Sequence, residues 1–294
     1  MKKTAEEIGF NIFALIVITI FAALCILPIL YTISGSFTPE QDLAMGLKLI
    51  PERFTLDAYR LVLKDPTAML RAYGVTIRLV IFGTALGLFL TTMTAYVLYR
   101  RDFKARNALS FFLFFTTLFS GGLVPHYILY CELGLRNTFL ALMLGGLLSV
   151  MNVIIVRSYF TANIPQELVE SGKIDGVNDF KIYTKIILPS SGPILATIGL
   201  LTALLYWNDW STAMIYISDS KLYPLQYYLY RIFQNAELKQ KMEAAGASTS
   251  AMTTPKESYK LAMTVFTMGP VILFYPFVQK YFVAGVTVGA VKGY

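Results

Sequence analysis

The sequence predicts an all-α membrane protein with six membrane-spanning helices. Hydrophobic residues make up 56% of the chain, charged residues only 15%, and the mean hydropathy is +0.58. Soluble proteins carry about 25% charged residues, so this composition excludes an ordinary soluble protein. A helix needs about 20 apolar residues to cross the hydrocarbon core. The segments that meet this requirement are, approximately, 9–31, 75–98, 108–129, 137–157, 190–207 and 261–280.

Charged residues before the first segment and near the start of the second need an interpretation. Lys2 and Lys3 before an apolar stretch are typical of signal peptides. The uncharged stretch over residues 8–31 is longer than a signal peptide needs, and no cleavage site of small residues follows, so we interpret it as a retained span. Arg78 lies near the start of the second segment, where its side chain can extend to the membrane surface. It is therefore no evidence of a proton relay.

The basic residues predict the orientation of the chain. Residues 100–106 contain four basic side chains in seven positions, and such loops face the cytoplasm. Counting spans from this loop places both termini and residues 158–189 inside. It places two long loops, about 32–74 and 208–260, outside. Residues 236–255 of the second loop are rich in Ala, Gly, Ser, Thr and Met, which favours a mobile loop.

The composition also argues against several kinds of site. Cys25 and Cys131 lie in or beside apolar segments, so neither a disulfide nor a metal site is expected. The single histidine, His126, has no cluster of partners, and we interpret it as an interfacial residue. The formal charge of +7 is typical of a membrane protein with basic cytoplasmic loops, and no motif indicates binding to nucleic acid.

A polar segment, residues 165–189, lies between two apolar ones and predicts a helix, a tight turn and a second helix. Pro165 suits the first turn of a helix over residues 167–174, and the pair Asp175-Gly176 breaks that helix. The second helix is capped by Asn178 or Asp179 and must end before Pro189. The apolar side chains that share one face of it, at helical spacing, are Phe180, Tyr183 and Ile187.

Within this segment, Glu170-Ser-Gly-x-x-Asp175-Gly176-Val177 is followed by Ile186-x-Leu188-Pro189. The pattern resembles the EAA loop, roughly E-A-A-x-x-D-G-A, a gap and I-x-L-P, of the permease subunits of binding-protein-dependent ABC importers. Ser171 and Gly172 replace two alanines of that pattern, and Val177 replaces the third. In that family the loop is a coupling helix docked in a groove of a separate ATPase subunit. The resemblance implies that the ATPase-coupling residues are Glu170, Ser171, Gly172, Asp175, Gly176, Leu188 and Pro189.

The resemblance extends over nearly the whole chain. Residues 34–39 and 51–59 resemble the region after the first span of sugar-importer permeases, and residues 279–293 resemble the end of maltose-type permeases. The branch that handles acidic or complex polysaccharide fragments is the most similar. The resemblance implies a type I ABC permease fold, with an N-terminal part (1–72), a transmembrane core (73–282) and a cytoplasmic tail (283–294).

The resemblance also implies partners and a location. The partners are a second homologous permease subunit, an ATPase dimer, an extracytoplasmic solute-binding protein and lipid. The location is the bacterial cytoplasmic, or inner, membrane. Residues 236–255 are expected to reach the cleft of the binding protein.

The chain has no phosphate-binding loop of its own. Gly172-Lys173 is followed by Ile174, where that loop needs a hydroxyl. We therefore expect no enzyme activity and no cofactor in this chain, with ATP and Mg²⁺ on the partner ATPase. The acidic residues of the 165–189 segment lie beside lysines and predict a solvated, salt-bridged face. The segment is thus interpreted as mechanical rather than catalytic.

Aromatic and amide side chains near the middle or the outer end of the spans are candidates for the substrate path. They are Tyr96, Asn152, Tyr206, Trp207 and Asn208. In some importers of this family only one of the two permeases holds the sugar. An alternative use of Asn152 is contact between helices. The glycines interpreted as close-packing positions between spans are Gly83, Gly87, Gly145 and Gly146.

Three other functions are weighed against an oligosaccharide importer. An ion-coupled secondary transporter would show carboxylates in its spans and inverted repeats, and the sequence shows neither. A membrane-embedded enzyme would need catalytic groups that are not evident. An ABC permease for a non-sugar solute would tend to lack the long first outer loop and the glycine-rich tail.

Overall fold

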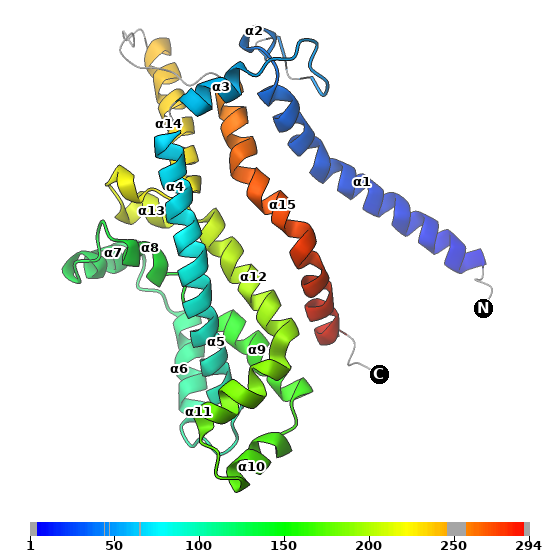
Figure 1. The fold of residues 1–294 in the computed structure, drawn as a ribbon, viewed down its shortest axis with the longest axis vertical. Coiled ribbons are helices and arrows are strands. Elements are labelled where there is room, and N and C mark those ends of the chain that lie inside the picture. The colour runs from blue at the N-terminus through cyan, green and yellow to red at the C-terminus, as the bar shows by residue number, and fades with distance from the viewer. Residues whose placement is uncertain (1–4, 44, 47, 65, 246–256, 291–294) are drawn as a thin grey trace. The chain divides into compact units, whose positions relative to one another are not determined.

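A computed structural model describes residues 5–43, 45–46, 48–64, 66–245 and 257–290, and these residues form helices and loops without any β-strand. This confirms the all-α prediction. The chain divides into two compact units, which are described separately (Figure 1). The first comprises residues 1–66 and 229–270, and the second comprises residues 67–228 and 271–294. Helices α14 (Leu225–Ala244) and α15 (Glu257–Ala290) contribute residues to both.

The first unit contains α1 (Ala5–Ser36), α2 (Glu40–Leu43) and α3 (Asp57–Lys64). The ring of Phe37 stacks on those of Phe54 and Tyr59, with centroids 4.8 and 5.0 Å apart. The Glu40 carboxylate accepts hydrogen bonds from the backbone N–H groups of Glu257 and Ser258, at 2.9 and 3.1 Å. A side chain from the predicted outer loop therefore caps the start of α15, because a helix N-terminus leaves such N–H groups unpaired.

The second unit is built around one long helix, Thr67–Tyr99, that is apolar enough to cross a membrane. It consists of α4 (Thr67–Arg78), a π-helical turn, η1 (Leu79–Gly83), and α5 (Thr84–Tyr99). At 1.5 Å per residue, Arg78 and Arg100 are about 33 Å apart along it, close to the thickness of the hydrocarbon core. This spacing suits two arginines that flank a membrane span.

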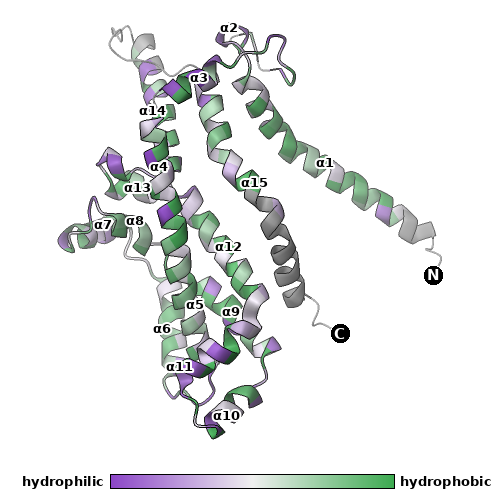
Figure 2. Ribbon diagram, viewed as in Figure 1, coloured by the Kyte–Doolittle hydropathy of each residue, from purple (hydrophilic) through white to green (hydrophobic). Residues whose placement is uncertain are grey.

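The remaining helices of this unit follow α5 in the chain. They are α6 (Arg106–Leu118), α7 (Leu123–Glu132), α8 (Phe139–Leu144), α9 (Val150–Asn163), α10 (Glu167–Ile174), α11 (Asp179–Ile182), η2 (Tyr183–Ile187), η3 (Pro189–Ser191), α12 (Gly192–Asn208), α13 (Ser211–Tyr216) and η4 (Ser220–Leu222). Of these, α6, α9 and α12 pack against α5. In Figure 1, α5, α6, α9 and α12 run alongside one another, with α10 and α11 at one end. In Figure 2, α5 and α6 are mainly hydrophobic, whereas hydrophilic residues stand out around α11.

Two predicted spans are interrupted, which corrects the prediction of uninterrupted helices over 108–129 and 137–157. The chain bends by 114° between helices α6 and α7. Gly122, in the break between them, has a φ of +85°, which glycine adopts without strain. Residues 145–149 separate α8 from α9, and the Ser149 hydroxyl accepts the Asn152 N–H to start α9.

The number of spans is established only in part. Among the described residues, three helices are long and apolar enough to cross a membrane, Gly9–Ser36, Thr67–Tyr99 and Pro189–Asn208, and the bent α6–α7 pair makes a fourth. The sixth predicted span falls in α15, of which many side chains lie outside the described part. The count of six therefore stays a prediction.

Two segments that were predicted as a loop and a tail are helical in part. The predicted mobile segment, 236–255, begins inside α14, which continues to Ala244, and residues 246–256 lie outside the described residues. The predicted tail at 283–294 is helical as far as Ala290. A helix is favoured there over a loose tail because the run is apolar and contains no proline.

The core of the second unit lies where α5 and α9 cross the polar segment. From α9, Val153, Val156 and Phe160 are fully buried, at the spacing of one helix face. They pack in one cluster with Tyr99 of α5 and Ile182 of α11. Because the polar segment contributes side chains to this cluster, it is fixed to the helices that carry it.

Candidate functional site

The polar segment forms a helix, a tight turn and a second helix, in agreement with the sequence. Helix α10 ends in a Schellman turn: the Gly176 N–H bonds to the Lys173 carbonyl at 3.0 Å and the Val177 N–H bonds to the Gly172 carbonyl at 2.9 Å. Gly176 has a φ of +70°, which explains the glycine. Pro165 lies before the helix rather than in its first turn.

The second helix differs from the prediction at its end. The Asn178 side chain caps α11 by accepting the Lys181 N–H at 2.8 Å, as expected. The chain does not stop at Pro189: Leu188 keeps helical angles, and the path runs through η2 and η3 into α12. The change from a π-helical turn to a 3₁₀ turn at this point accommodates a proline that has no N–H to donate.

Gly172 is the position where the two helices of the segment pack most closely. A Cβ atom placed on Gly172 would lie 3.2 Å from the Ile182 side chain, which is fully buried. Val169, three residues earlier, is buried on the same face of α10. The small residues expected from the EAA pattern are thus explained at this position by contact inside the chain.

The opposite side of the segment exposes apolar side chains. Ile174 is 86% exposed and Phe180 is 56% exposed, although the prediction placed Phe180 on one face with the buried Tyr183 and Ile187. Glu170 and Asp175 of the same segment are also exposed. We name the surface formed by Glu170, Ile174, Asp175 and Phe180 the loop surface. The sequence analysis missed Ile174. Its helical spacing could have indicated it, because Ile174 does not share the face of α10 that carries the buried Val169 and Gly172.

A network centred on Arg100 ties this segment to the end of α5. The Arg100 guanidinium donates to Asp102 Oδ1 and Oδ2, at 2.7 and 2.6 Å, to Asp179 Oδ1 at 2.6 Å and to the Tyr96 hydroxyl at 2.7 Å. Lys173 of α10 forms a salt bridge with Asp102. Only 7% of the Arg100 side chain is exposed. We call these five residues the Arg100 network.

The network remains charged at physiological pH. The hydrogen bonds from Arg100 hold the pKa of the Asp102 carboxyl well below its usual range. The same bonds to Asp102 raise the pKa of the Arg100 guanidinium, against the effect of burial. The ion pair between Arg100 and Asp102 is therefore retained at physiological pH.

Tyr96 belongs to this network and not with the other substrate-path candidates. Its ring is buried and lies at a tilt to that of Tyr183, with centroids 5.5 Å apart. The Arg100 guanidinium lies over the Tyr96 ring, 5.5 Å from its centroid. The sequence analysis placed Tyr96 near the middle of the membrane or its outer mouth. The structure places it beside α11, because α5 ends only three residues later.

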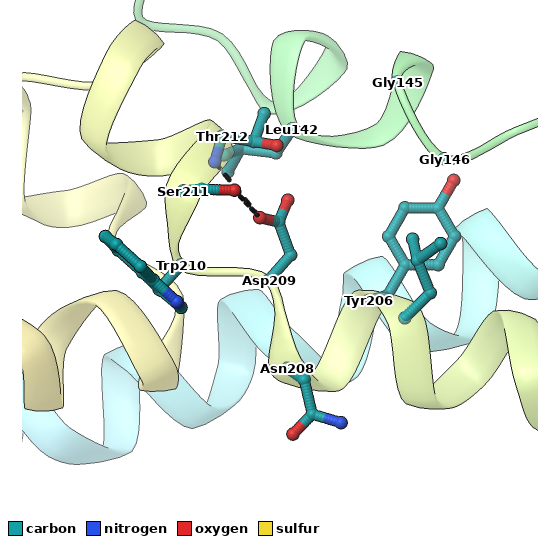
Figure 3. A pocket seen from close by; sticks show the side chains of 10 residues that line it. Leu142, Gly145, Gly146, Tyr206, Asn208, Asp209, Trp210, Ser211 and Thr212 are labelled. Carbon is teal, nitrogen blue, oxygen red and sulfur yellow. Dashed lines mark hydrogen bonds between the residues drawn. The ribbon is translucent and has the colours of Figure 1, made fainter.

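A pocket of about 370 Å³ lies at the other end of α12 (Figure 3). Tyr206, Asp209 and Trp210 line it, together with Gly145 and Gly146 of the break before α9. The Asp209 carboxylate accepts hydrogen bonds from the Ser211 hydroxyl and the Thr212 N–H, at 3.0 and 3.1 Å. The pocket thus combines two aromatic rings, a carboxylate and a hydroxyl.

Tyr206 fixes the wall of this pocket. Its hydroxyl donates to the Met143 carbonyl at 2.7 Å, and its ring fills the space over two glycines. A Cβ atom would meet the ring at 2.4 Å on Gly83 and at 2.8 Å on Gly146. Both glycines, and Gly87 beside Leu147, are close-packing positions, whereas Gly145 has nothing within 4 Å.

The other candidates for the substrate path lie nearby but differ in role. Asn208 also lines the pocket, but its side chain points away from Asp209 and donates to the Leu204 carbonyl at 2.9 Å (Figure 3). The Trp207 indole N–H is buried without a hydrogen-bond partner among the described residues. Asn152 is half-buried in the first turn of α9. The structure therefore gathers Tyr206 and Asn208 at the pocket, with Trp207 and Asn152 outside its lining.

Metal-binding side chains do not gather in the described part of the chain, where no group of three or more His, Cys, Asp or Glu residues has the geometry to hold an ion. The chemistry available at both sites is therefore that of ion pairs, hydrogen bonds and aromatic faces.

Comparisons with known proteins give consistent relatives. Residues 78–288 match the family described as binding-protein-dependent transport system inner membrane component. The chain is 40% identical to the polygalacturonan/rhamnogalacturonan transport system permease protein YtcP of Bacillus subtilis, over 93% of this chain and 94% of the relative. It is 30% identical to the arabinooligosaccharides transport system permease protein AraQ of Halalkalibacterium halodurans, over 92% and 93%.

A solved structure shows the same fold. It is a bacterial ABC transporter involved in the import of the acidic polysaccharide alginate, with a TM-score of 0.82 and 29% identity over 96% of this chain and 99% of that one. The family match covers well over half of the sequence and includes both the Arg100 network and the loop surface. The chain therefore belongs to the family of inner membrane components of binding-protein-dependent transport systems.

Proposed function

We propose that this chain is one of two homologous permease subunits of an ATP-driven oligosaccharide importer, and that residues 165–189 dock onto a partner ATPase. The observation that carries the proposal is the loop surface. Exposed Ile174 and Phe180 project from two short capped helices whose other faces are packed into the core. Apolar side chains on a rigid polar segment are typical of a surface that a partner covers.

The mechanism that fits this geometry is mechanical. ATP and Mg²⁺ bind to the ATPase pair, and closure of that pair moves the docked loop surface. The Arg100 network and the buried contacts of Gly172 pass the movement to α5 and α12, because the segment is linked to both without a flexible joint. The two ends of the chain and the loop surface then lie on the cytoplasmic side, and an extracytoplasmic binding protein delivers the solute.

The pocket at Tyr206 is our candidate for the solute path. Helices α6 and α9 are each about 20 Å long, shorter than the hydrocarbon core, so the break at residues 145–149 falls within the membrane. Irregular backbone at that depth is tolerated where it lines a cavity or is buried in protein. Aromatic rings beside hydroxyl and carboxylate groups suit the faces and hydroxyls of a sugar. The relatives named above support a fragment of an acidic polysaccharide as the solute.

Docking is tested by co-purification with the ATPase. The full-length chain is co-expressed with its neighbouring permease and ATPase candidates, and the ATPase recovered with it is quantified. We expect Ile174→Ser to reduce recovery about tenfold, because the substitution removes apolar contact without disturbing packing. Glu170→Lys combined with Gly176→Asp should also lose the ATPase while the chain still inserts.

Leu133→Ser is the matched control, since Leu133 is also an exposed aliphatic side chain, 62% exposed against 86% for Ile174, but lies at the end of α7. Unchanged ATPase recovery in both loop variants would contradict the docking proposal. Uptake of labelled oligogalacturonate by cells that carry the complex tests the solute. Uptake driven by an ion gradient in the absence of any ATPase would favour the secondary transporter instead.

A further inference from the structure

A second cavity beside the 165–189 segment is lined by three arginines. It has a volume of about 540 Å³ and lies where the ends of α5 and α9 meet the start of α6. Arg101 follows α5, Arg106 is the first residue of α6, and Arg157 lies in the last two turns of α9. Three cations from three elements therefore converge on one space.

These arginines have no anionic partner in the described part of the chain. Arg100, next to Arg101 in the sequence, takes the carboxylates of Asp102 and Asp179 for itself. Glu167 also lines the cavity, but no ion pair within 4 Å joins it to any of the three arginines among the described residues. One carboxylate faces three guanidinium groups, so the cavity retains an excess of positive charge.

The walls of the cavity are held in place by hydrogen bonds. The Tyr99 hydroxyl donates to the Ile164 carbonyl at 2.9 Å, and the Gln166 amide donates to the Tyr99 carbonyl at 3.4 Å. Arg106 and Arg157 are half-buried, and Arg106 lies on the same face of α6 as the buried Leu113. Two of the three arginines are therefore partly enclosed beside a wall that hydrogen bonds hold in place, and the mutual repulsion of the three charges favours an anion between them.

We propose that this cavity binds a phosphate group, as the headgroup of an anionic phospholipid carries. Arginine presents a planar fork of donors that matches phosphate oxygens, and several arginines outside a span at the cytoplasmic surface are typical of anionic lipid sites. The cavity lies at the end of α5, about 33 Å from Arg78, which is the level of the headgroups if Arg78 lies at the other surface. The inference does not depend on which solute the chain transports.

The cavity is distinct from the surface proposed to dock the ATPase. Neither Ile174 nor Phe180 lines it, and its α10 wall comes from the residues at the start of that helix. A phosphate bound there would instead neutralise the arginines at the ends of α5, α6 and α9, next to the start of the 165–189 segment. We therefore expect the lipid to steady the segment rather than to compete with the ATPase.

The test uses the full-length chain in nanodiscs that contain phosphatidylglycerol and phosphatidylcholine. The phosphatidylglycerol retained by the protein after extraction is measured by native mass spectrometry. We expect Arg106→Gln combined with Arg157→Gln to retain about tenfold less than the unmodified chain. Arg71→Gln combined with Arg136→Gln removes the same two charges from exposed positions outside the cavity and should retain the normal amount.

Two further arms complete the experiment. Arg101→Gln removes one of the three charges of the cavity at an exposed position, where the substitution does not disturb folding. Lower retention of phosphatidylglycerol by this variant therefore cannot result from misfolding. In phosphatidylcholine nanodiscs, inorganic phosphate is added and the thermal transition is followed. Stabilisation by inorganic phosphate without retention of phosphatidylglycerol would identify free phosphate as the ligand. Equal retention in all variants with no phosphate effect would overturn the proposal.

Discussion

Arg100 is the single side chain on which the geometry of the 165–189 segment most depends. It contacts Tyr96 in its own helix, Asp102 in the following loop and Asp179 in α11, and it is almost fully buried. Glutamine at this position is too short and uncharged, so the carboxylates of Asp102 and Asp179 lose their donor. Hydrogen bonds to charged groups are worth about 1.5–3 kcal/mol each where they are shielded from water, and the exposed sides of both carboxylates reduce this value.

We therefore expect Arg100→Gln to lower solute uptake about tenfold while ATP hydrolysis continues, because the ATPase still docks but moves a loosened segment. Arg100→Lys keeps the charge but lacks the planar fork of donors of the guanidinium, so its uptake should lie between those of the unmodified chain and Arg100→Gln. Arg71→Gln, an exposed arginine of α4, is the control. The ratio of solute transported to ATP hydrolysed is measured in proteoliposomes. A normal ratio in Arg100→Gln would show that the network is not part of the coupling.

The pH dependence of coupling follows from the same residues. The pKa of Asp102 is lowered in the folded chain, so its contribution is present above the ordinary pKa of an aspartate and is lost only as the pH falls through the lowered value. The pKa of Arg100 is raised, so its charge persists at every working pH. We expect the coupling ratio to stay flat between about pH 5.5 and 8. A steep change in that window, absent from Arg100→Gln, would show that the network titrates.

At the scale of elements, Tyr206 locks α12 against η1 and against the break before α9. Ala at Gly83 would place a methyl group 2.4 Å from the Tyr206 ring, so Gly83→Ala should strongly lower the thermal stability of the purified chain. Tyr206→Ala leaves a cavity and should cost roughly 3–5 kcal/mol. The double variant should be less destabilised than the sum, because the new methyl group occupies space that the ring has left. Additive effects would contradict this packing.

Local signals explain which parts of the site could be predicted from the sequence. The Asp175-Gly176 turn and the Asn178 cap depend on residues within a few positions, and both appear as expected. The Arg100 network depends on a contact between residues about 80 positions apart, which periodicity does not reveal. The continuation through Pro189 was not predicted because a proline usually ends a helix. The break at residues 145–149 could not be predicted because Gly145 and Gly146 equally suit close packing between spans. The break at residues 119–122 could not be predicted because apolar segments continue on both sides of it.

At the scale of the whole molecule, the bent α6–α7 pair raises the main question about topology. If the pair crosses the membrane, the loop that holds Lys104 and the loop that holds Arg136 lie on opposite sides. If the pair is a re-entrant hairpin, both lie on the same side, and the 114° bend is compatible with either path. The four basic residues at 100–106 favour the cytoplasm for Lys104, whereas Arg136 is a lone cation after α7.

We therefore predict that single cysteines at these positions react from opposite sides. The exposed native cysteines, Cys25 and Cys131, are first replaced by serine so that they do not react. In intact cells, a membrane-impermeant maleimide should label Arg136→Cys, but should label Lys104→Cys and Lys185→Cys only after permeabilisation. Lys104 is the internal reference, because it precedes α6 in the loop with four basic residues, whereas Lys185 reports the side of the 165–189 segment. Protection of Arg136→Cys in intact cells would make α6–α7 a re-entrant pair, and the orientation of every later helix would have to be reversed.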